Sequence, residues 1–445
     1  MADAKAKFLS GSLFRHVTVM SLTASVGLMA VFAVDFVDIV FIAMLGKAEL
    51  AAAVGYAGAI LFFTTSFSVG MMIALVARAL GTGDRELAQE RTAHGLLYGV
   101  IFGAFFALAV WLCVGPLVRL LGATGETAAL AAIYLRIVVP SLPLLLVGMM
   151  GGAILRAHGD ARRAMMATLY GGGVNLVLAP ILIFGLDLEL VGAALASVAA
   201  RFAIAATALL PILRQYGGIP RPRRAGLIRD FRPILAIAFP AILTQLATPV
   251  GQAIVTRSMA QFGEEAVAAM AIVARLTPVS FGVIFALSGA VGPIIGQNYG
   301  AKDFERVRRG YNAALLFTGL VIVLISALLF GLRAPIADLF DAQGEMRDLL
   351  YLFCGPLALL FFFNGVLFVS NAAFNNLGHP FYSTFMNWGR NTLAMIPAVL
   401  LGAHWFGAGG VLIGQAVAGV VFGLVAWALA ARVISASGNA ALRAS

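Results

Sequence analysis

The stretch Gly81-Thr-Gly-Asp-Arg-Glu86 returns later in the chain as Gly300-Ala-Lys-Asp-Phe-Glu305, with glycine, aspartate and glutamate at matching positions. The offset between the two copies is 219 residues, from position 81 to position 300. The same offset, or one within two residues of it, joins Pro116 to Pro335, Gly125-Glu126 to Gly344-Glu345, Gly159 to Gly378, Tyr134 to Tyr351 and Gly46 to Gly263. Because these matches fall in several separate loops, we interpret the chain as two copies of one unit.

Long apolar runs surround both copies, and the composition excludes a water-soluble globule. Of the 445 residues, 61% are hydrophobic and 11% are charged, whereas about 25% of the residues in a soluble domain are charged. A bilayer core is crossed by roughly 20 apolar residues in a helix. Twelve runs of sufficient length predict transmembrane helices at 17–44, 50–79, 92–118, 128–153, 162–186, 190–213, 234–260, 266–297, 311–333, 347–376, 382–402 and 408–433.

Each copy of the repeat contains six spans, so both copies enter the membrane from the same side. Such a parallel repeat has a pseudo-two-fold axis along the membrane normal. We therefore predict an all-α integral membrane protein with twelve transmembrane helices in two six-helix bundles. The predicted domains are an N-terminal lobe at 1–214, a cytoplasmic basic linker at 215–233 and a C-terminal lobe at 234–445. Two bundles around a central cavity are typical of an alternating-access carrier.

The net charge of +10 is explained by membrane topology. Most Lys and Arg residues lie in short loops on the side of the N-terminus, which predicts that both termini are cytoplasmic in a multi-pass protein of the plasma (inner) membrane. These basic residues do not form a stripe with interleaved aromatics, so nucleic acid is not an expected partner. The expected partners are small organic substrates and membrane lipid, and the expected oligomeric state is a monomer.

The energy source is inferred by elimination. No phosphate-binding Walker A sequence is present, because the Gly46-Lys47 pair is followed by Ala48. The five histidines are scattered, and Cys113 and Cys354 lie singly in apolar stretches, so ligands for a redox cofactor are lacking. We therefore expect a transporter and not an enzyme, with no cofactor and with H+ or Na+ as the coupling ion.

Two acidic residues lie inside a predicted span. Asp35 and Asp38 are flanked by Val31-Phe-Ala-Val34 and Ile39-Val-Phe-Ile42. At positions i and i+3 they share one helix face, with Cβ atoms roughly 5–6 Å apart. Two carboxylates this close in a medium of low dielectric constant cannot easily both ionise. Membrane-embedded acids are usually functional, so we predict a site that exchanges a proton or binds a cation.

Several motifs resemble those of the multidrug and toxic compound extrusion (MATE) transporters. They are Arg275-Leu-Thr-Pro278, Gly296-Gln-Asn-Tyr-Gly-Ala-Lys-Asp303, Phe36-Val-Asp38, and Leu155-Arg-Ala-His-Gly-Asp160 leading into Asn175-Leu-Val-Leu-Ala-Pro180. The chain is most similar to the DinF-like branch, because the NorM-like branch carries acids where Thr248 and Asn364 stand here. The resemblance implies cation or proton coupling by Asp38, Tyr134, Asn175 and Ser197, with Na+ bound, if at all, at Asp38 and Asn175.

This sequence departs from the family pattern at two positions of the N-terminal lobe. A fifth-span aspartate is replaced by Ala179, and a first-span proline is replaced at about Thr23, although the second half keeps its counterpart, Pro240. One hypothesis is that Asp35 supplies the second acid in place of residue 179. The alternative is that Asp35 forms a structural ion pair with the embedded Arg201.

The remaining polar residues of the spans leave the substrate open. Arg201 and Arg390 are expected to have structural roles, bonding backbone carbonyls or extending toward the cytoplasm. Gln245, Asn364 and Asn371 are candidates for lining a substrate cavity, although each also suits a helix contact. We predict efflux of bulky cationic or amphipathic organic compounds by H+ or Na+ antiport. A lipid or polyisoprenoid-linked flippase of the same superfamily and a major-facilitator-type carrier are the alternatives.

Overall fold

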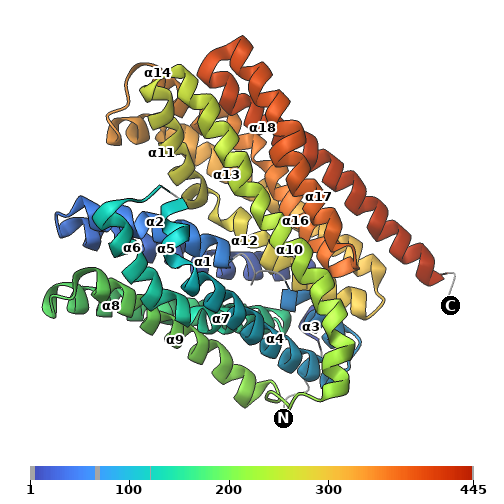
Figure 1. Cartoon of the computed structure of the whole chain (residues 1–445). Helices are drawn as coiled ribbons and strands as arrows, with labels where there is room; N and C mark the ends of the chain where they lie inside the picture. The colour runs from blue at the N-terminus through green and yellow to red at the C-terminus, as the bar shows by residue number, and fades with distance from the viewer. Residues whose placement is uncertain (1–5, 66–70, 121, 443–445) are drawn as a thin grey trace. The chain divides into compact units, whose positions relative to one another are not determined.

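The computed structural model describes residues 6–65, 71–120 and 122–442, and the regular elements in these ranges are helical (Figure 1). The first half forms η1 (Lys7–Leu9), α1 (Leu13–Met44), α2 (Ala48–Thr65), α3 (Met71–Gly81), α4 (Arg85–Leu112), α5 (Val114–Leu120), α6 (Gly125–Val138), η2 (Val139–Ser141), α7 (Leu142–Ala157), α8 (Ala161–Pro180), η3 (Ile181–Gly185) and α9 (Glu189–Gln215). The second half forms α10 (Arg224–Met259), η4 (Ala260–Phe262), α11 (Glu264–Ser280), α12 (Gly282–Gly300), α13 (Phe304–Leu339), α14 (Gly344–Leu352), η5 (Phe353–Leu357), α15 (Ala358–Leu360), α16 (Phe362–Leu377), α17 (Pro380–Trp388), η6 (Gly389–Ala394) and α18 (Met395–Leu442).

The predicted spans correspond to helices that are long and apolar enough to cross a membrane. Eight stretches of the described chain pass this test alone, and two bent pairs, α11 with α12 and α14–α15 with α16, pass it together. The last stretch, Pro380–Gly438, turns at Phe406 and Gly407 and so contains both predicted spans 382–402 and 408–433. The predicted span 50–79 contains α2 and α3, and residues 66–70 between them lie outside the described residues.

The repeated aspartates begin equivalent helices in the two halves. Asp84 caps α4, where its carboxylate accepts a hydrogen bond of 2.8 Å from the backbone N–H of Leu87. Asp303 caps α13 in the same way, with a bond of 2.9 Å from the N–H of Arg306. An aspartate at this position satisfies a backbone donor that the helix leaves free. The repeat that was read from the sequence is therefore a repeat of helix starts.

The repeated glycines form equivalent turns. Gly159 and Gly378, which follow α7 and α16, have φ angles of 80° and 93°. Gly125 and Gly344, at the first residues of α6 and α14, have φ angles of 56° and 52°. These left-handed conformations favour glycine, because any side chain would be strained there. Matching turns at one offset explain why the glycines recur.

The described chain forms two compact units, and each unit contains the start of one helix whose remainder belongs to the other unit. One unit comprises the residues up to Ser25, Gly81–Gly83 and the residues from Phe239 onward, and the other comprises Val26–Leu80 and Asp84–Ala238. The early part of α1 therefore groups with the second half, and the early part of α10 groups with the first half. The predicted lobes at 1–214 and 234–445 stay a prediction, and α10 begins inside the predicted linker.

The two segments that precede or begin α1 and α10 are held by polar contacts, and the contacted residues, Phe8 and Leu227, lie 219 positions apart. In the first unit, the backbone N–H of Phe8 donates to Oε1 of Gln297 at 2.9 Å, and Arg306 donates to the carbonyl of Phe8 at 3.0 Å. In the other unit, the hydroxyl of Tyr98 donates to the carbonyl of Leu227 at 2.8 Å. Positions 8 and 227 differ by the same 219 residues as the loop motifs. The exchange is therefore part of the repeat.

Candidate coupling site

Asp38 and Asn175 are in direct contact. Asp38 lies on α1, in the part of this helix that belongs to the same unit as α8, and Asn175 lies on α8. The Nδ2 group of Asn175 donates a hydrogen bond of 3.0 Å to Oδ2 of Asp38. The structure thus brings together the two residues that the sequence analysis placed in one cation site.

The amide of Asn175 leaves an oxygen free. Asn175 is 4% exposed, and its Oδ1 atom is buried with no hydrogen-bond partner among the described residues. A buried polar atom without a partner costs about 1–3 kcal/mol, so such an atom in a native protein needs an explanation. Amide and carboxylate oxygens are ligands that hard cations prefer. Asn175 therefore gives its N–H group to Asp38 and keeps free an oxygen of the type that binds cations.

Tyr134 lies in the same unit as Asp38 and Asn175. It is within electrostatic range of Asp38, Asp35 and Arg201 and close to Ser197 of α9. Tyr134 belongs to the apolar cluster that also contains Leu135, Val138 and Ala196. This packing fixes the tyrosine ring on α6, near the other residues that the resemblance placed in the coupling site.

The position of the lost family acid is apolar in this chain. Ala179 is fully buried in the same cluster as Tyr134, next to the partly buried Leu178 and Leu182. Asp35 is exposed, lies within electrostatic range of Asp38, and forms no hydrogen bond or ion pair with the described residues. The hypothesis that Asp35 replaces the second acid stays a prediction.

Arg201 has other partners than Asp35. Its Nη1 donates to the carbonyl of Val138 and to Oγ of Ser141, each at 2.9 Å. The predicted bond to a backbone carbonyl is confirmed, and the alternative of an Asp35–Arg201 ion pair is wrong. The reason is geometric, because the last residue of α6 and the last residue of η2 present the two oxygens to Arg201, which is 9% exposed.

The predicted cavity residues of the second half do not form one cluster. Asn364 accepts a hydrogen bond from Nη1 of Arg390, so the expectation that Arg390 bonds a backbone carbonyl is wrong for this contact. Asn371 is 7% exposed, and its backbone carbonyl accepts from Ser383 of α17 at 3.3 Å. Gln245 is partly buried on α10. Within the described residues, no hydrogen bond joins these three side chains to one another.

Sequence reasoning missed a buried polar cluster at the start of α10. His94 is fully buried on α4, and its Nδ1 lies 2.7 Å from Oδ2 of Asp230. Arg229 binds both Asp230, at 2.9 Å, and Glu90, at 2.8 Å. The repeat offset of 219 residues relates Phe8 to position 227. Applying it to the N-terminal segment would have drawn attention to the start of α10, where Arg229 and Asp230 lie.

The described part of the chain contains no group of three His, Cys, Asp or Glu side chains that could hold a metal ion.

The profile of the MatE family matches residues 24–181 and 240–400, which is most of the chain. The protein belongs to the MatE family. Like other members, it is a membrane transporter of small molecules and not an enzyme.

The relatives cover the chain at low sequence identity. An FAD transporter of Shewanella oneidensis (strain MR-1) is 28% identical over 439 residues, which are 96% of each chain. The multidrug export protein MepA of Staphylococcus aureus is 24% identical over 76% of this chain and 75% of its own. A crystal structure of a MATE protein in a bent conformation matches with a TM-score of 0.89 at 24% identity and covers 98% of each chain. The predicted fold class is thereby confirmed.

Proposed function

We propose that this chain exports amphipathic organic compounds in exchange for H+ or Na+, with Asp38 as the coupling residue. The observation that supports this proposal is the contact between Asp38 and Asn175, which leaves the buried Oδ1 of Asn175 without a hydrogen-bond partner. The assignment to the DinF-like branch, the choice of coupling ion and the location in a bacterial inner membrane with cytoplasmic termini belong to the same proposal.

The mechanism follows from differential binding. In the outward-facing state, Asp38 takes up the ion, which lowers the affinity for substrate. The substrate leaves, the protein changes to the inward-facing state, and the ion is released inside. Coupling of this kind requires that the ion bind one state better than the other, because equal affinities shift no equilibrium.

Transport by purified protein in liposomes tests the proposal. Efflux driven by an imposed pH or Na+ gradient is compared among the wild type, Asp38→Asn and Asp35→Asn, with Asp341→Asn as a matched control in an exposed loop. We expect Asp38→Asn to abolish gradient-driven transport and the control to keep it. Transport by Asp38→Asn at the wild-type rate would overturn the proposal. Loss in Asp35→Asn would support its role as the second acid.

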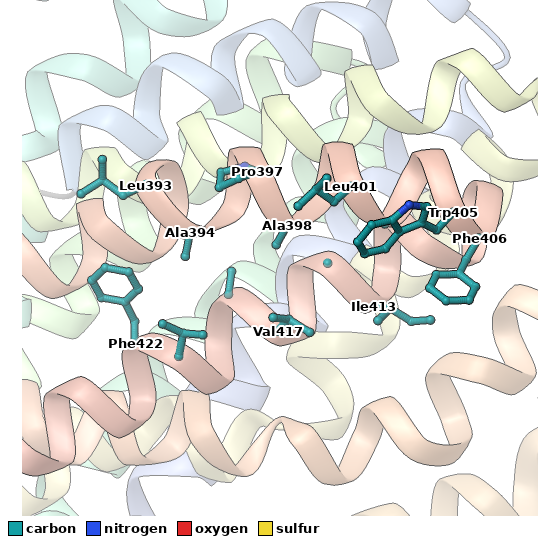
Figure 2. A pocket seen from close by; sticks show the side chains of 14 residues that line it. Leu393, Ala394, Pro397, Ala398, Leu401, Trp405, Phe406, Ile413, Val417 and Phe422 are labelled. Carbon is teal, nitrogen blue, oxygen red and sulfur yellow. The ribbon is translucent and has the colours of Figure 1, made fainter.

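A lipid flippase is the second candidate function, and a groove on the second half favours it. The groove of about 530 Å³ lies between η6 with the first part of α18 and the returning part of α18 (Figure 2). Its lining includes Leu393, Leu401, Trp405, Val417 and Phe422, and no charged side chain lines it. An acyl chain suits such a surface in a bilayer. A lipid-scrambling assay on the same liposomes separates the two functions. A flippase moves labelled lipid between the leaflets, whereas an exporter of organic compounds does not.

A further inference from the structure

Arg390 is a cation inside the predicted eleventh span. It lies in η6, a π-helical segment between α17 and α18. Nη1 donates to Oδ1 of Asn364 on α16, and Nε is buried without a hydrogen-bond partner among the described residues. A guanidinium has five N–H donors, so this contact leaves most of its binding capacity unused.

In the described part of the chain, no carboxylate forms an ion pair with Arg390. The last acidic residue of the sequence is Asp348, in the middle of α14, so the two final predicted spans and their loops contain no Asp or Glu. The ion pairs of the second half join Glu305 to Arg308 and Arg309, and Asp338 to Arg347. A charge in a membrane interior normally pairs with an opposite charge or with backbone carbonyls. Among the described residues, Arg390 has only the neutral amide of Asn364.

Arg201 provides the comparison for a structural arginine. Its guanidinium is bound to the carbonyl of Val138 and the hydroxyl of Ser141, two neutral oxygens at 2.9 Å. The two embedded arginines, which the sequence alone treats alike, therefore differ in how much of their binding capacity is used.

The surroundings of Arg390 contain small residues. A Cβ atom at Gly419 would lie 3.1 Å from Nδ2 of Asn364, and a Cβ atom at Gly251 would lie 2.3 Å from Oδ1 of Asn391. The neighbouring amide of Asn391 is already bonded to the carbonyl of Asn387 at 2.8 Å. The glycines let α10 and α18 approach these polar side chains closely, and the Nε group of Arg390 stays the donor without a partner.

We propose that Arg390, positioned by Asn364, binds an anionic phosphate or carboxylate group, carried by the transported compound or by a lipid headgroup. Guanidinium matches both anions through parallel hydrogen bonds. This inference rests on the proposed transport function and concerns the charge of its ligand. It replaces the expectation of a cationic substrate with that of an amphipathic compound that bears an anion. The substrate named for the Shewanella relative, FAD, is of this chemical class.

Two flavins test the ligand charge: FAD carries a diphosphate and an adenosine that riboflavin lacks, and the Arg390 variants assign any preference to the phosphates. Binding of FAD and of riboflavin, which has the same ring system but no phosphate, is measured on the full-length protein in detergent. We expect the wild type to bind FAD at least about tenfold more tightly than riboflavin, as charge-assisted bidentate contacts allow. The preference should be lost in Arg390→Gln, be retained in part in Arg390→Lys, and be unchanged in Arg432→Gln, an exposed control in the same unit.

A lipid arm distinguishes the source of the anion. Retention of phosphatidylglycerol against phosphatidylcholine by the purified protein is compared between the wild type and Arg390→Gln. If flavins are bound equally but phosphatidylglycerol retention falls in the variant, the anion is a headgroup. Equal flavin binding together with unchanged lipid retention would overturn the proposal. The wild-type FAD-to-riboflavin comparison and the Arg390→Lys variant keep the test valid if Arg390→Gln does not fold.

The two proposals fail in different ways. If Arg390→Gln changes neither ligand preference while Asp38→Asn still abolishes gradient-driven transport, the anion inference is wrong and the transport proposal stands. If Asp38→Asn transports normally, the coupling proposal fails whatever Arg390 binds.

Discussion

At the scale of single residues, the embedded polar side chains differ in whether their buried donors and acceptors have hydrogen-bond partners. Arg201 is bound by two oxygens, whereas Asn175 and Arg390 each keep a buried atom without a partner in the described chain. A buried polar group without a partner is costly, and a protein that keeps one usually uses it. The unsatisfied groups are therefore better guides to function here than the number of polar residues in a span.

Asn175→Leu should weaken ion coupling while leaving the protein folded. The substitution removes both the donor to Asp38 and the free oxygen, so the apparent affinity for the coupling ion should fall by about tenfold, which corresponds to roughly 1.4 kcal/mol. The measurement is the rate of liposome efflux as a function of the imposed ion concentration. If the efflux rate of Asn175→Leu depended on ion concentration as in the wild type, Asp38 would act without Asn175.

Arg201→Met should destabilise the protein. The change removes the guanidinium donor from the buried hydroxyl of Ser141 and from the carbonyl of Val138, which keeps only its bond from that hydroxyl at 2.7 Å, at a cost of about 1–3 kcal/mol. A lower midpoint of thermal unfolding in detergent is the expected result. An unchanged midpoint would mean that water or another group replaces the guanidinium.

At the scale of elements, the repeat is built from helix starts and turns. Asp84 and Asp303 cap α4 and α13, and the glycines of the pairs 125/344 and 159/378 adopt left-handed conformations. These are positions where the backbone itself restricts the side chain, which is why two halves of otherwise different sequence retain the same residues there. The apolar faces between them tolerate many hydrophobic side chains and carry little signal.

Removal of either cap should cost similar stability. Asp84→Ala and Asp303→Ala should each lower the free energy of unfolding by about 1 kcal/mol, because one backbone donor loses its acceptor. Asp84→Asn and Asp303→Asn keep an acceptor oxygen and serve as matched controls. If the Ala and Asn variants unfold at the same temperature, the carboxylates do not act as caps.

The loop between α7 and α8 should show a pH-dependent contribution to stability. Burial raises the pKa of Asp160, but hydrogen bonds from Tyr216, at 2.8 Å, and from Arg163 outweigh burial and hold this pKa below its usual range. Burial and the bond to Asp160 raise the pKa of Tyr216 to about 12. An aspartate whose pKa is lower in the folded than in the unfolded protein stabilises the fold at pH values above the unfolded pKa. This contribution is lost as the pH falls through the folded pKa.

Tyr216→Phe tests this linkage. The variant should be less stable than the wild type by about 1 kcal/mol near neutral pH, and the difference should shrink as the pH falls below the usual aspartate range and Asp160 takes up a proton. It should persist at moderately alkaline pH, because Tyr216 stays protonated there. A difference that does not depend on pH would assign the effect to packing.

At the scale of the whole molecule, each compact unit contains the beginning of a helix from the other half of the sequence. The docked segment around Phe8 is held by Gln297 and Arg306, and the segment around Leu227 is held by Tyr98 and the His94–Asp230 pair. Both segments lie at the start of a helix that continues into the other unit.

Asp230→Ala should destabilise the protein more than loss of an exposed ion pair does. Asp230 and His94 are both buried, and removal of one member of such a pair costs about 3 kcal/mol or more. Glu305→Ala, which breaks exposed pairs with Arg308 and Arg309, is the control and should change stability by less than about 1 kcal/mol. Equal thermal midpoints for the two variants would show that the buried pair does not hold this segment.

The sequence predicted the fold well because its signals are strong. Long apolar runs, loop charges and capping residues at one offset indicate twelve helices in two related halves. The contact of Asp38 with Asn175 was also predicted, through the family resemblance. The exchange of helix starts, the partners of the two arginines and the apolar surroundings of Ala179 were not, because each depends on packing between helices distant in sequence, which local patterns do not encode.

The most direct test of the central claim is competition between ion and substrate on purified protein. Binding of FAD, an amphipathic compound that bears an anion, is measured while the pH is lowered or Na+ is added, for the wild type and for Asp38→Asn. We predict that the ion weakens substrate binding by the wild type and has no effect on Asp38→Asn, because the ion binds at Asp38. Equal weakening in both proteins would contradict the account.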